Sequence, residues 1–167
     1  MHALVTALAG CLDEAVAVQE RLLERVRAQR EAIVSGDTAR VEEASRRMEA
    51  DVLRLGGIES TRNRLAGELA DALGVVAARW SALREALPER ERRVLGPRVA
   101  RVEELVRELE LQNAVNGQLV RTELALVDSS VRSLGAADPR LVTRAYAPGG
   151  GAPAPAPSGP VILNLAA

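Results

Sequence analysis

Three long segments of the chain carry apolar side chains at alternating intervals of three and four residues. The first runs from Val5 to Ile33, the second from Val41 to Leu73, and the third from Val99 through Val102, Val106 and Leu109 to Leu134. Glu, Arg and Gln fill many of the positions between them. This spacing predicts long amphipathic α-helices that each bury one stripe of side chains.

The limits of the first two helices follow from residues that suit helix ends. Gly36 fits the C-terminal turn of a helix over about 3–34, and Asp37 fits the N-cap of the next. We expect the second helix to reach about Leu73 without a break. The central Gly-Gly pair costs about 1 kcal/mol per glycine in a helix interior, which close packing or a slight bend accommodates.

Prolines and glycines divide the following region. A short helix is predicted from the apolar positions Val76, Trp80, Leu83 and Leu87, with Trp80 in or beside the core. Pro88 must begin a new segment or kink the old one. Gly96-Pro97 indicates a further boundary, with Pro97 in the first turn of the last long helix. That helix is expected to end at Leu134, with Gly135 in the C′ position.

The C-terminal region breaks the periodicity. "APGGGAPAPAPSGP" predicts a disordered linker, and the apolar "VILNLAA" follows it. This apolar segment can extend a partner's surface, cover the protein's own groove or do nothing, and we favour a weak intramolecular cover. The predicted fold class is all-α: an elongated antiparallel bundle of three long helices plus a short one over 1–146, with a disordered tail over 147–167.

Composition excludes several classes of protein. Only 1% of the residues are aromatic, which argues against a β-sandwich or barrel, and the 47% hydrophobic and 27% charged residues suit long helices. A net charge of −1 with interleaved signs argues against nucleic-acid binding. No apolar run reaches the roughly 18 residues of a membrane span. Asp13 and Glu14 interrupt the apolar N-terminus, which also lacks a positive start, so we reject a signal peptide and expect a cytoplasmic protein.

The sequence also gives little support for catalysis, metal binding or a cofactor. The one histidine, His2, sits at the chain terminus, so a histidine-ligated di-metal bundle site is excluded. Cys11 has no histidine on its helix face and is better explained as a small buried side chain. The glycines at 149–151 lack the strand and helix that flank a phosphate-binding loop. Carboxylates alternate with arginines at helical spacing, which is typical of a solvated helix face.

Two asparagines interrupt the apolar stripe of the last helix, in "LELQNAVNGQLV". Asn113 and Asn116 lie three residues apart where apolar residues are expected, and Gly117 follows. A buried asparagine can fix helix register and partner choice at some cost in stability. A satisfied structural amide and a direct contact with a bound partner both remain open for these residues.

The order of these features resembles the FlgN family of flagellar type III export chaperones over about 4–150. The resemblance rests on the "GD" that ends the first helix, on "RNRLAGEL" in the second and on "LELQNAVNGQLV" in the last. A tyrosine downstream, Tyr146, with Gly149 three residues later, completes the pattern. The "GAPAPAPSGPVILNLAA" tail departs from it.

The resemblance implies a cytoplasmic chaperone that hydrolyses no nucleotide. Its partners would be the C-terminal amphipathic helices of hook-associated proteins at the hook–filament junction, and the cytoplasmic domain of the export gate. Tyr146, the single tyrosine of the chain, would dock on that gate as an anchor, and the alternative is an ordinary surface or cap residue. The candidate client-binding residues, equally explicable as core, are Leu119, Val120, Leu124, Val127, Val131 and Leu134. A monomer or weak homodimer is expected. The alternative is a structural or adaptor coiled coil that self-associates and has no flagellar role.

Overall fold

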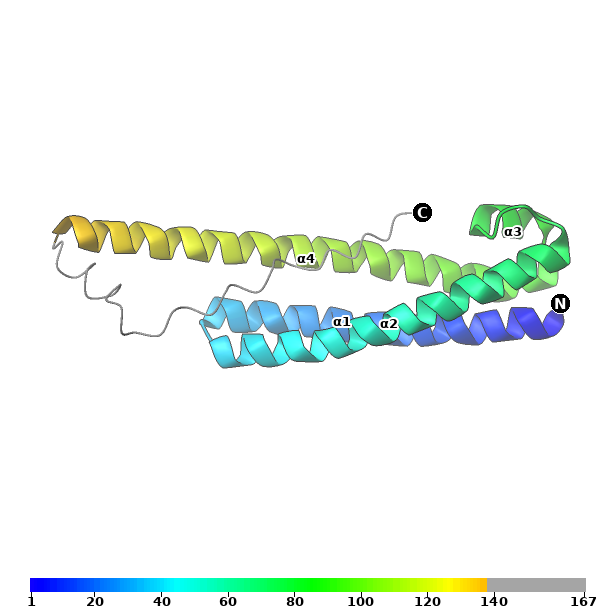
Figure 1. Cartoon of the computed structure of the whole chain (residues 1–167), viewed down its shortest axis with the longest axis horizontal. Coiled ribbons are helices and arrows are strands. Elements are labelled where there is room, and N and C mark those ends of the chain that lie inside the picture. Colours follow the sequence, from blue (N-terminus) through cyan, green and yellow to red (C-terminus); the bar gives the residue numbers. More distant parts are fainter. Residues whose placement is uncertain (138–167) are drawn as a thin grey trace. The chain divides into compact units, whose positions relative to one another are not determined.

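The computed structural model describes residues 1–137, which are all-helical apart from short connections (Figure 1). The elements are α1 (His2–Ser35), α2 (Thr38–Leu73), α3 (Trp80–Ala86) and α4 (Glu89–Ala137). No strand occurs in this described part, so the predicted fold class of three long helices and a short one is confirmed there. Contacts divide the chain into two compact units, Met1–Arg121 and Thr122–Ala167, and the description of packing below concerns the first.

The turn between α1 and α2 is built from the predicted capping residues. Gly36 adopts a left-handed conformation with φ of 68°, and the backbone N–H groups of Gly36 and Asp37 donate to the last carbonyls of α1. The Asp37 carboxylate then accepts a hydrogen bond from the Arg40 backbone N–H at 3.0 Å. Gly74, also at φ 68°, ends α2 in the same way. Only glycine adopts this conformation without a steric penalty, so both turns are set locally.

In the unit Met1–Arg121, α1 and α2 form an antiparallel hairpin (Figure 1). The first part of α4 runs in the same direction as α1. The ion pairs between the two helices show this, since the residue numbers of both partners increase together from pair to pair. Asp13 pairs with Arg98, Glu20 with Arg101, and Arg27 with Glu108. Sliding α4 by one heptad would place Arg27 opposite Arg101, two like charges, so this ladder opposes a register shift.

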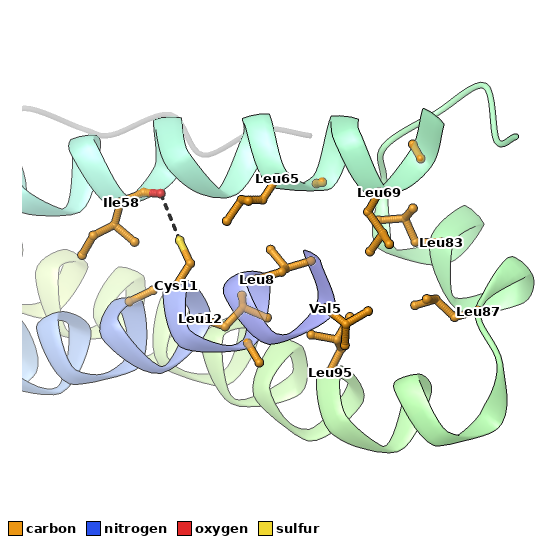
Figure 2. Packing of buried hydrophobic residues seen from close by; sticks show 14 of the residues in the cluster. Val5, Leu8, Cys11, Leu12, Ile58, Leu65, Leu69, Leu83, Leu87 and Leu95 are labelled. Atoms are coloured by element: carbon orange, nitrogen blue, oxygen red, sulfur yellow. Dashed lines mark hydrogen bonds between the residues drawn. The ribbon is translucent and has the colours of Figure 1, made fainter. Parts of the chain in front are cut away.

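The apolar core is densest where α3 meets the long helices. Figure 2 shows side chains of all four elements converging there, including Leu12 of α1, Leu69 of α2, Leu83 of α3 and Leu95 of α4. Trp80, the first residue of α3, is half-buried against this cluster. A Cβ on Gly96 would lie 3.9 Å from the Trp80 ring, so α4 passes close to the indole. The prediction of Trp80 beside the core is confirmed.

Both predicted ends of the last long helix are wrong. Pro97 does not begin a helix but lies inside α4, which starts at Glu89 directly after Pro88. Pro88 supplies the stronger start, because its carbonyl accepts the first helical bond and acidic residues follow in the first turn. Pro97 is exposed, so its ring faces solvent while the buried Leu95 holds the helix in place.

The other boundary concerns the end of α4. Gly135 was expected beyond the helix, yet α4 continues through it to Ala137. Alanine has the highest helix propensity, and the two alanines after the glycine carry the helix on. The short helix α3 also begins later than the Val76 of the prediction, at Trp80. The region 138–167, which holds the predicted linker and tail, lies outside the described residues.

Candidate functional site

The buried seam of α4 combines predicted and unpredicted residues. Val102 and Leu109 pack against the core as expected, but the fully buried positions are Leu95 and Leu105. Val106, which the spacing placed in the seam, is only half-buried beside Leu105. Apolar residues occupy two adjacent stripes here, and periodicity alone does not say which one faces α1 and α2.

Asn116 is the last buried side chain of α4 among those that the structure describes, with 5% of its surface exposed. Its Nδ2 donates to the Val26 carbonyl at 2.9 Å and to Gln29 Oε1 at 3.2 Å. Its Oδ1 accepts from Arg30 Nε at 3.0 Å. Three groups of α1 therefore satisfy the amide, as a buried polar group requires.

This polar cluster extends to Gln112 and to α2. The Arg30 guanidinium also donates to the Gln112 side-chain carbonyl. Gln29 Nε2 donates to Ser45 Oγ at 3.1 Å, so side chains of α1, α2 and α4 form one connected layer. An amide that needs three correctly placed partners strongly penalises a shifted register. Asn116 thus has the satisfied structural role that the sequence left open.

Asn113 behaves differently, since its side chain is exposed. It lies one turn before Asn116 on a neighbouring face, and the cluster around Asn116 does not include it. The expectation that both asparagines interrupt the seam is therefore correct for Asn116 and wrong for Asn113.

Beyond Asn116, α4 carries large apolar side chains in water. Leu124 is 63% exposed, Val127 is 59% exposed and Val120 is 40% exposed. Leu119 is half-buried, while the side chains of Val131 and Leu134 lie outside the described part. Counting from Asn116, the positions 120, 124 and 127 follow at intervals of four, four and three. The exposed residues therefore repeat the spacing of the buried seam along the same helix.

A second set of exposed apolar residues on α4 lies outside the predicted stripe. Leu111 is 62% exposed, Val115 is 43% exposed and Leu126 is 57% exposed, at positions that a helical projection places away from the seam. The signal was present in the sequence as a four-residue interval between Leu111 and Val115. It was overlooked because the stronger stripe dominated the helix.

Residues 1–137 contain no group of three or more His, Cys, Asp or Glu side chains placed to hold a metal ion. The Cys11 thiol is buried and donates to the Ile58 carbonyl at 3.5 Å, and burial raises its pKa (Figure 2). A raised pKa disfavours the reactive thiolate.

Charged side chains in the hairpin have structural partners. The buried Asp51 carboxylate lies 2.8 Å from Arg25 and 3.5 Å from Arg21. On the surface, hydrogen bonds from Arg46 and Arg47 hold the pKa of Glu43 below its usual value. Across residues 1–137, no helix is both long enough and apolar enough to cross a membrane.

The arrangement is therefore a registered helical scaffold with apolar side chains left in water along α4. Tyr146, the predicted gate-docking residue, lies outside the described residues. In comparisons with known proteins, no curated protein and no solved structure matches the chain significantly. The sequence model of the FlgN protein family, by contrast, matches residues 1–154. The chain thus belongs to the FlgN family, a family of flagellar export chaperones.

Proposed function

We propose that this chaperone acts in the cytoplasm and binds the C-terminal amphipathic helices of hook-associated proteins along α4. The observation that carries the proposal is the set of exposed aliphatic side chains after Asn116, at the spacing of the buried seam. The proposed binding residues are Leu119, Val120, Leu124, Val127, Val131 and Leu134. A bound helix would occupy this stripe as α1 occupies the seam before it.

Physical chemistry supports an amphipathic helix as the ligand. A helix presents apolar residues at the same intervals of three and four, so two such stripes interdigitate along their length. Fully burying a Leu or Val side chain contributes about 1.5–3 kcal/mol, so covering the exposed part of Leu124 or Val127 contributes roughly 1–2 kcal/mol. Covering the same surface of the client would keep its helices from associating with one another before export.

The proposed cycle ends at the export gate, where Tyr146 docks on the cytoplasmic domain of the gate protein. A tyrosine buries a large area and loses little conformational entropy, so a single one can anchor a weak complex. The chaperone itself hydrolyses no nucleotide in this proposal.

A second candidate is self-association through α4. The exposed Leu111, Val115 and Leu126 favour it, because they offer another apolar set to a second copy. In that case the protein would be a structural coiled coil, and its exposed residues would be covered at high protein concentration without any client.

One binding experiment separates the two candidates. A peptide spanning the C-terminal helix of a hook-associated protein is titrated into the full chain by calorimetry, and the complex is sized by light scattering. The proposal expects a one-to-one complex of a monomeric or weakly dimeric chaperone. A stable homo-oligomer that ignores the peptide would refute it.

Substitutions then assign the surface. Leu124→Asp with Val127→Asp should abolish peptide binding while the helical circular dichroism and unfolding midpoint stay unchanged, since both side chains are already exposed. Ala125→Asp with Ser129→Asp is the matched control, with equal added charge on exposed positions of the same helix. Unfolding of the first variant would place those residues in the core and refute the assignment.

The gate-docking role has its own test. Tyr146→Ala should weaken binding to the cytoplasmic domain of the gate protein and leave peptide affinity as it is. Loss of peptide binding instead would move Tyr146 to the client surface.

A further inference from the structure

We propose that residues 161–167, "VILNLAA", bind the exposed apolar face of α4 formed by Val120, Leu124 and Val127 in the same chain. A helix that binds this face must displace them, so they act as a built-in competitor. The contact itself is a property of this chain alone, whereas its regulatory effect rests on the proposed function.

The chemistry of the two partners is complementary. Four of the seven residues in the segment are large and aliphatic, namely Val161, Ile162, Leu163 and Leu165, and none is charged. The α4 face is aliphatic too and, in the described residues, its side chains remain 40–63% exposed. Apolar surface exposed to water is unfavourable, and contact between the segment and the α4 face would remove part of both surfaces from water.

The connection is long enough. Along the helix, Leu124 lies about 20 Å before Ala137, at 1.5 Å per residue. Residues 138–160, which join α4 to the segment, span at most about 75–80 Å when extended. The segment can therefore return to positions 120–127 without any change in α4. A tethered ligand also faces a high effective concentration, so even a weak contact is populated.

The contact should be weak enough for a client to displace it. The segment is short, and the face holds only three described side chains. We expect the covered form to outnumber the open form about four to one, which would weaken the apparent affinity of a competing helix about fivefold.

The first test reads the contact directly and needs no client. In the full chain with labelled methyl groups, Ile162→Asp with Leu163→Asp should shift the methyl signals of Val120, Leu124 and Val127. Ala154→Asp with Ala156→Asp is the matched control, since it adds the same charge without removing large apolar side chains. The shifts should persist on dilution. Unmoved signals in the first variant would overturn the proposal, as would shifts that vanish on dilution with loss of a dimer.

The second test reads the competition. The same Ile162 and Leu163 variant should bind the C-terminal peptide of a hook-associated protein about fivefold more tightly than the unaltered chain, and the control should not. Equal or weaker binding would overturn the competitive role. If the peptide binds neither protein, the proposed function fails, while the methyl signals still decide whether the segment covers α4.

Discussion

Replacing Asn116 by alanine tests whether the polar layer between α1 and α4 stabilises the fold. The substitution removes the donor to the Val26 carbonyl and to Gln29, and the acceptor for Arg30. Asn113→Ala is the matched control, because it makes the same chemical change three residues away on an exposed position. Whatever alanine adds through helix propensity is common to both variants.

The magnitude follows from the contacts. Each hydrogen bond contributes about 1 kcal/mol net, so losing three costs about 3 kcal/mol. Arg30 is half-buried and water can reach it, which keeps its bond near the ordinary value. Exchanging asparagine for alanine in a helix returns up to about 0.7 kcal/mol. Asn116→Ala should therefore lower the free energy of unfolding by about 2 kcal/mol, while Asn113→Ala should raise it by about 0.5 kcal/mol.

Urea unfolding followed by circular dichroism measures the difference. With a slope of about 2 kcal/mol per molar urea, the midpoints of the two variants should lie about 1.25 M apart. Equal midpoints, or a lower one for Asn113→Ala, would refute the assignment of Asn116 as a buried and satisfied amide. A changed slope would indicate that the substitution altered the compactness of the folded or unfolded state instead.

Two further predictions concern the backbone of α4 and the core. Pro97→Ala should raise the free energy of unfolding by about 1–2 kcal/mol, because a proline inside a helix removes one backbone hydrogen bond, an effect partly offset by a freer unfolded chain. Urea unfolding checks this, and a destabilised variant would show that Pro97 begins a helix after all. The buried Cys11 thiol should react with a disulfide reagent far more slowly in the native than in the unfolded protein. Burial also raises the pKa of this thiol above its unfolded value of about 8.5. The free energy of unfolding, relative to that of Cys11→Ala, should therefore be constant below that pH and fall above it. Native labelling as fast as unfolded labelling would contradict the burial.

The hairpin was predictable from the sequence because its signals are local. A glycine at positive φ and an aspartate cap act on the turn that contains them, so Gly36 and Asp37 fixed the end of α1 and the start of α2. The stripe of α1 was also recovered, since its apolar residues occupy one face with few competitors. Such features depend on neighbours within a few residues.

Most of the errors occurred in α4. Pro97 and Gly135 are helix breakers by propensity, yet α4 continues through both, Pro97 at an exposed position and Gly135 ahead of two strong helix formers. Leu105 rather than Val106 became fully buried because α1 and α2 select one of two possible stripes. Asn113 and Asn116 are chemically identical, and only the positions of Val26, Gln29 and Arg30 on α1 distinguish them. For the client-binding surface, the sequence supplied the residues, and their role remains a prediction.

The position of Trp80 gives the protein an optical reporter for one end of its fold. The chain has a single tryptophan, half-buried where α3 meets the core and close to Gly96 of α4. Indole emission therefore registers whether α3 remains docked, whereas the circular dichroism signal comes mainly from the three long helices. If α3 detaches before those helices melt, the emission change will precede the loss of ellipticity, and the gap between the two curves will measure how cooperatively the short helix is coupled to the rest.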